Sequence, residues 1–162
     1  MDFVMDLMIR LTGLIYDVNR LTLGLSGNRD LSFVEGAERG IDINKFELKK
    51  ETDIELYKKR REAFELSQRI MMMIQEMPWD EKVDLDLKVL KAAEYSMTGY
   101  LDNYEAYQKA LDEMNKPGFT VEDKEAYGLL LDKLKETYTK NETAAQYFEN
   151  MHHYLGAYRR SK

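Results

Sequence analysis

The chain has 162 residues, a length typical of one domain with its own hydrophobic core. Hydrophobic residues make up 44% of the sequence and charged residues 33%, a balance too apolar for wholesale disorder. With no cysteine and only 2 histidines, the composition excludes disulfides, thiolate chemistry and a three-histidine metal site within one chain. We therefore expect a single helical domain over residues 1–162.

The first predicted helix carries the clearest heptad pattern. Its apolar residues recur at alternating intervals of three and four positions: Val4, Leu7, Leu11, Leu14, Val18, Leu21 and Leu25. Only a helix places such residues on one stripe. Gly24 and Gly27 are expected to end this helix.

The segment 24–43 is the irregular part of the chain, and it holds four of the nine glycines. A connection of this length commonly packs on the domain or carries a function. We interpret it as a strap packed on the bundle, with a ligand-binding loop as the alternative.

A second helix is predicted to end at Met77 and Pro78, because the residue before proline is disfavoured in the helical region. Its expected buried face comprises Ile54, Tyr57, Phe64, Met71 and Ile74. The run of apolar residues from 70 to 74 covers every side of a helix, so at least one of its methionines must point outward.

Two longer helices follow, separated by the turn signal at 115–118. The expected seam of the first comprises Val83, Leu87, Leu90, Glu94, Met97, Leu101, Tyr104, Gln108 and Leu111. The expected seam of the second comprises Tyr127, Leu131, Leu134, Tyr138, Asn141, Ala145, Phe148, His152 and Leu155. No strand pattern is present. The sequence therefore predicts an all-α fold, an elongated antiparallel four-helix bundle with coiled-coil packing and a long C-terminal helical hairpin.

The net charge of −6 argues against a duplex nucleic-acid partner. Residues 79–115 hold nine acidic and four basic side chains, and this difference accounts for nearly all of the net negative charge of the chain. This stretch is either a solvated helix face or a docking face for another protein with a basic surface. For docking, the candidate partner-binding residues are Asp80, Asp84, Asp102, Tyr100 and Tyr107.

Tyrosine is enriched, with 9 of its 11 residues between positions 95 and 158. Tyrosine suits helix interfaces and protein-binding surfaces equally, so packing within the hairpin is the alternative to partner binding. A homodimer is also consistent with the continuous apolar seam of the first predicted helix and with the spare methionines.

Four carboxylates provide a possible metal site, Glu62 and Glu65 followed by Glu81 and Asp84. This E-x-x-E and E-x-x-D spacing resembles that of the all-α nucleotide pyrophosphohydrolases related to MazG and dimeric dUTPase. The resemblance covers only residues 62–84, and it implies a magnesium-dependent hydrolase with these residues as metal ligands. Pro78 and Trp79 interrupt the second motif helix, which departs from the family pattern.

Glu149 and His152 form an E-x-x-H pair, the spacing that di-iron helical bundles use. In such a metal site, Glu94 would be a further ligand. The alternative is a structural His152 that bonds to Glu94 or Gln108 across the hairpin.

The start of the chain lacks a signal-peptide pattern, and no apolar run is long enough to span a membrane. We therefore expect a soluble cytoplasmic protein. No motif supports nucleophilic catalysis or a required cofactor. The sequence favours a non-enzymatic interaction protein: an adaptor, a regulator or a stoichiometric inhibitor of the kind that phages and mobile elements encode. The alternative is the pyrophosphohydrolase.

Overall fold

The computed structural model describes residues 2–25 and 51–161, and these fold into four helices with no strand among them. Helix α1 spans Asp2–Leu25 and α3 spans Glu51–Glu76. The two longest helices follow, α4 over Trp79–Met114 and α5 over Val121–Ser161. The predicted all-α class is confirmed, whereas residues 26–50, most of the predicted strap, lie outside the described residues.

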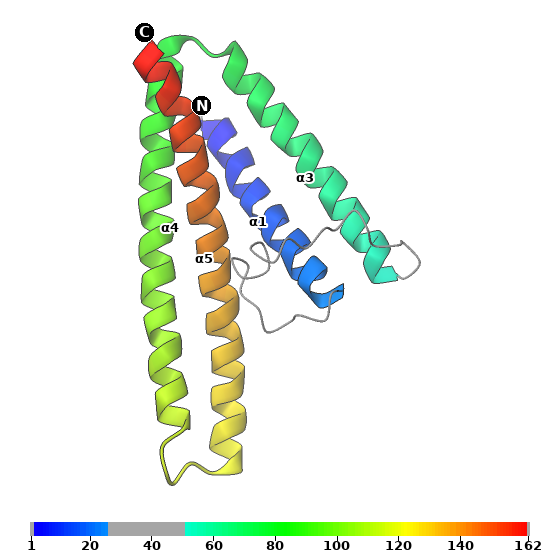
Figure 1. Ribbon diagram of the computed structural model, residues 1–162, viewed down its shortest axis with the longest axis vertical. Helices are drawn as coiled ribbons and strands as arrows, with labels where there is room; N and C mark the ends of the chain where they lie inside the picture. Colours follow the sequence, from blue (N-terminus) through cyan, green and yellow to red (C-terminus); the bar gives the residue numbers. More distant parts are fainter. Residues whose placement is uncertain (1, 26–50, 162) are drawn as a thin grey trace.

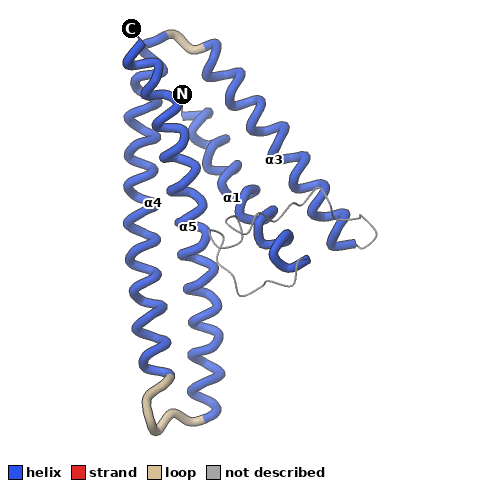
Figure 2. The backbone as a smooth tube through the Cα atoms, in the orientation of Figure 1, coloured by secondary structure: helices blue, strands red, loops and turns tan. Residues whose placement is uncertain are grey.

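The helices alternate in direction along the chain, as Figure 1 shows. Helices α4 and α5 form a long antiparallel hairpin, and α1 packs beside the upper half of α5. Helix α3 packs mainly on α1 and diverges from the hairpin toward its own N-terminus (Figure 2). The bundle therefore has four helices at one end, while the hairpin extends alone at the other.

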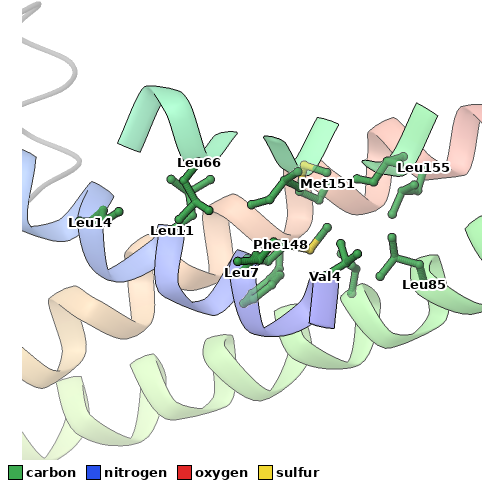
Figure 3. Close-up of a cluster of buried hydrophobic side chains, with 13 residues drawn as sticks. Val4, Leu7, Leu11, Leu14, Leu66, Leu85, Phe148, Met151 and Leu155 are labelled. Carbon is green, nitrogen blue, oxygen red and sulfur yellow. The ribbon is translucent and has the colours of Figure 1, made fainter. Parts of the chain in front are cut away.

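The hydrophobic core lies at the four-helix end (Figure 3). The predicted seam of α1 is confirmed there, because Val4, Leu7, Leu11 and Leu14 are all buried. The other helices add the remaining buried members, Leu66, Ile70, Ile74, Leu85, Val89, Phe148, Met151 and Leu155, beside Met8 of α1. Burial of such side chains is the main favourable contribution to folding.

The predicted buried face of α3 is only partly right. Ile74 is fully buried, but Ile54, Tyr57 and Phe64 are exposed, with 61% of Phe64 accessible to solvent. The buried face comprises Leu56, Leu66, Ile70 and Ile74, so it is rotated around the helix from the predicted one. Both faces carry apolar residues at helical spacing, so periodicity could not decide between them. The prediction for the methionine run is confirmed, because Met72 points outward and is 61% exposed.

The predicted seam of α4 is also wrong, for a related reason. Leu87, Met97 and Leu101 are exposed, because α4 meets α5 through a different seam with heptad spacing. This seam consists of small or short side chains: Val89, Ala92, Ser96, Gly99, Asn103, Ala106 and Ala110. A Cβ atom added at Gly99 would lie 3.0 Å from Nδ2 of Asn141 on α5. The two backbones thus approach closely where the side chains are small.

The hairpin turn and the seam of α5 agree with the predictions. Met114 ends α4, and Gly118 has φ of 95° in the turn, a conformation that favours glycine. Thr120 then caps α5: its Oγ1 accepts a hydrogen bond from the Asp123 N–H, and the Asp123 carboxylate accepts one from the Thr120 N–H. Leu131, Tyr138, Ala145, Phe148 and Leu155 are buried as expected.

Among the described helices, none combines the length and the hydropathy that crossing a lipid bilayer requires.

The burial pattern gives a test of the fold with two matched substitutions. Leu85→Ala removes a fully buried side chain, so we expect it to lower the free energy of unfolding by about 2–5 kcal/mol. Leu129→Ala is the control, because Leu129 is 74% exposed and its truncation should cost about 0.5 kcal/mol or less. Urea unfolding followed by circular dichroism measures both. Equal losses would contradict the burial of Leu85 in the core.

Candidate functional site

The acidic ridge of α4 is defined here by Asp80, Asp84 and Asp102, all three of which are exposed. Asp84 and Asp102 are 18 residues apart, which is about five helical turns, so the two carboxylates lie on the same side of α4. Asp80 lies one turn before Asp84. Lys88 and Lys91 fall between the ends of the ridge, which therefore presents negative charge in two places along one rigid helix.

A second exposed feature of α4 lies next to the acidic ridge, on the side of the helix away from the α5 seam. We call it the α4 stripe: Leu87, Leu90, Glu94, Met97, Leu101 and Tyr104. All of its members are exposed except Leu90, which is half-buried, and 57% of Leu101 is accessible to solvent. Apolar residues at heptad spacing on an outer face mark a surface suited to protein contact.

The predicted partner residues Tyr100 and Tyr107 lie elsewhere, against the hairpin interior. Both rings contact the ring of Tyr138 on α5 edge-on, with centroids 6.0 and 5.5 Å away. Tyr104 joins them at 5.4 Å from Tyr138 and 5.8 Å from Tyr100. The structure thus brings the tyrosines together as a packed cluster, apart from the three aspartates.

The tyrosine cluster changes the acidity of its central phenol. Burial, followed by the neighbouring phenols of Tyr107, Tyr104 and Tyr100, raises the pKa of Tyr138 to about 12. Burial also raises the pKa of Tyr100, with Glu142 contributing. These phenols therefore stay neutral well into the alkaline range.

The four carboxylates Glu62, Glu65, Glu81 and Asp84 do not form a metal site. Over the described ranges 2–25 and 51–161, no group of three or more acidic, histidine or cysteine side chains could hold a metal ion. Glu62 instead accepts a hydrogen bond from Arg10 of α1 at 3.0 Å. Glu65 accepts one from Arg61 at 3.2 Å. The structure thus gives both α3 carboxylates partners other than the acids of α4.

His152 has a partner that the sequence did not indicate. Its Nδ1 lies 2.7 Å from Oδ1 of Asp86, a fully buried carboxylate on α4. The expected partners were Glu94 and Gln108, but Glu94 is exposed on the α4 stripe. Glu149 pairs instead with His153, at 3.8 Å. Glu149 and His152 therefore take part in two separate contacts, and the one between His152 and Asp86 joins α5 to α4.

Comparison of the chain with protein-family models, curated proteins and solved structures finds no match in any of the three.

The raised pKa of Tyr138 predicts how alkaline pH affects stability. The unfolded chain loses this proton near pH 10 but the folded chain retains it to about pH 12, so stability falls as pH rises between the two values. Tyr138→Phe removes the ionising group and should reduce this fall. The measurement is urea unfolding at several alkaline pH values. Tyr95→Phe is the control, because that ring is 82% exposed, and an equal reduction there would contradict the assignment.

Proposed function

We propose that this protein is a non-enzymatic interaction module, an adaptor, regulator or stoichiometric inhibitor that binds a basic surface of another protein through the acidic ridge. The observation that carries the proposal is the exposure of Asp80, Asp84 and Asp102 on one side of α4. The ridge spans 22 residues, or about 33 Å of helix. Its negative charge can therefore steer and orient a partner over a long contact.

The packing of the hairpin supports a binding role in a second way. α4 and α5 stay in close contact along their length, so the carboxylates are held at fixed spacing. A fixed array loses little conformational freedom when a partner binds, which favours affinity. The two lysines between its ends add a pattern of signs that a complementary surface would match, and such patterns provide specificity.

We place this activity in the cytoplasm, because a chain without cysteine suits a reducing compartment.

The proposal is tested by charge reversal with a matched control. The triple variant Asp80→Lys, Asp84→Lys and Asp102→Lys reverses the acidic ridge. The control variant Glu122→Lys, Glu125→Lys and Asp132→Lys makes the same change in net charge at exposed positions of α5. Tagged wild-type and variant proteins are used to purify partners from native extract, with mass spectrometry as the readout.

We expect a basic protein that the wild type and the control retain and that the ridge variant loses. Its binding to purified wild-type protein should weaken as salt concentration increases, because exposed charges are screened. Equal retention by all three proteins would show that the acidic ridge is not the binding surface.

A further inference from the structure

A line of mostly charged side chains runs along the exposed side of α4. We call it the charge stripe: Asp84, Lys88, Lys91, Tyr95, Thr98, Asp102, Glu105 and Lys109. Its members recur at alternating intervals of four and three residues, which places them on one side of a helix. All of them are exposed, and 82% of Tyr95 is accessible to solvent. The charge stripe contains two members of the acidic ridge, Asp84 and Asp102, together with the lysines between them.

The charges of this stripe are self-complementary about its centre. Pairs of residues that lie equally far before and after the centre have opposite signs: Lys91 with Asp102, Lys88 with Glu105, and Asp84 with Lys109. The centre falls between residues 96 and 97. The same point is the middle of α4, which spans Trp79–Met114. The stripe therefore matches itself when it is read in the reverse direction.

From this symmetry we infer that two copies of the chain associate through their charge stripes, with the two α4 helices packed side by side and antiparallel. In such a pair, residues at equal distances on opposite sides of the centre meet in the same layer. Lys91 of each copy therefore meets Asp102 of the other. A twofold axis perpendicular to α4 at its midpoint relates the two copies, so each contact occurs twice and the dimer closes.

Charge selects the orientation and the register of this pairing. A parallel pair would place each charge of the stripe against the same charge of the other copy. If the antiparallel pair slides by one heptad in one direction, Asp84 meets Asp102, and in the other direction Lys91 meets Lys109. Juxtaposed like charges disfavour an interface. The centred antiparallel register avoids this, because it joins opposite signs in all three pairs.

Apolar groups at the same contact provide affinity. Tyr95 of one copy meets Thr98 of the other next to the twofold axis. Leu87 and Leu101 border the stripe on one side and are 44% and 57% exposed in the single chain. The lysines add their methylene groups to the contact. Removal of these groups from water favours association, whereas the ion pairs chiefly fix which surfaces meet.

The position of α4 leaves room for a second copy. Helices α1 and α3 lie on the α5 side of the hairpin, so α4 forms the opposite edge of the described chain (Figure 1). Antiparallel pairing places the free end of each hairpin beside the four-helix end of the other copy. The part of α4 that α1 and α3 do not support therefore gains a neighbour.

An existing contact within the stripe does not oppose the pairing. Lys109 and Glu105 of one copy lie 3.1 Å apart, and both side chains are mostly exposed. An exposed pair of this kind contributes little to stability. Lys109 can therefore turn to Asp84 of the second copy, and Glu105 can turn to Lys88.

The dimer covers part of the acidic ridge, because Asp84 and Asp102 belong to both surfaces. The dimer itself does not depend on the proposed function. Its consequence does rest on that function: a basic partner would have to displace the second copy before it reaches these two aspartates.

The first test is the mass of the purified chain in solution, measured by sedimentation equilibrium at micromolar concentrations. We expect the wild type to be dimeric. Lys91→Asp and Asp102→Lys each create two contacts between like charges, so each variant should dimerise roughly tenfold more weakly or worse. Lys133→Asp is the control, because it makes the same charge change as Lys91→Asp at an exposed position of α5, and it should leave the mass unchanged.

Restoration distinguishes this pairing from other dimers. The double variant K91D/D102K restores opposite charges and should again be dimeric. An equimolar mixture of the two single variants should form mixed dimers, because each contact then joins a lysine to an aspartate. Circular dichroism should show unchanged helix content in every variant, since both positions are exposed.

A substitution that strengthens the dimer is also available. The next pair beyond the stripe, Glu81 and Asp112, breaks the rule because both residues are acidic, and both are exposed. Asp112→Lys gives this outermost pair opposite signs, so the variant should dimerise more tightly than the wild type.

Spin labels test the antiparallel orientation. The chain has no cysteine, so Glu94→Cys or Glu113→Cys introduces one label site per copy, and both positions are exposed. In the centred register the two labels of a dimer are separated along the helices by about 8 Å at position 94 and about 50 Å at position 113. Double electron–electron resonance measures both separations, and a parallel dimer would give similar values at the two sites.

Four results would overturn the inference: a monomeric wild type, single variants that dimerise as tightly as the wild type, a double variant that stays monomeric, or equal label separations. All of these measurements use the purified chain alone, so their outcome is separate from that of the partner purification. Lys91→Asp keeps all three aspartates of the acidic ridge, and under the proposed function it should still retain a basic partner.

Discussion

The close approach of α4 and α5 governs the rest of the structure. Helices pack at a distance set by the side chains between them, and here the shared seam of α4 consists of alanine, serine, glycine and other short residues. Gly99 marks a close approach, because Asn141 occupies the space that a Cβ atom would need. Since small residues fill this contact, Leu87, Met97 and Leu101 of α4 are left on its outer side.

The two ends of the bundle are consequently stabilised in different ways. At the four-helix end, long aliphatic side chains from all four helices meet in one buried cluster. Along the rest of the hairpin, small residues of α4, the tyrosine cluster around Tyr138 and Leu131 of α5 lie at the contact between the two helices. The fully buried Asp86 lies near the larger cluster, where His152 provides its compensating partner across the helix pair.

The sequence predicts where the helices begin and end. It predicts which side of a helix is buried for some of the helices and not for others. The boundaries of the helices at Pro78, Gly118 and Thr120 could be predicted from local sequence alone, because proline, glycine and capping residues act on the backbone next to them. The face of α1 was also predicted, since α1 has one dominant apolar stripe.

The faces of α3 and α4 could not be predicted in the same way, because each helix carries two sets of residues at helical spacing. Leu87 and Val89 both fit a heptad, and only the close approach of α5 decides that Val89 is buried. The same ambiguity hid the pairing of His152 with Asp86, which depends on the stagger between α4 and α5. Of the candidate site, the exposed aspartates were placed correctly on α4, whereas Tyr100 and Tyr107 belong to the hairpin contact.

The placement of α1 has a consequence for how the molecule opens. Helix α3 contacts the rest of the described chain chiefly through α1, and α1 in turn lies against α5. Detachment of α1 would therefore release α3 with it, so the two N-terminal helices should exchange their amide hydrogens as one cooperative unit. The hairpin keeps its own extensive contact when they leave, which makes it the slowest part of the molecule to open.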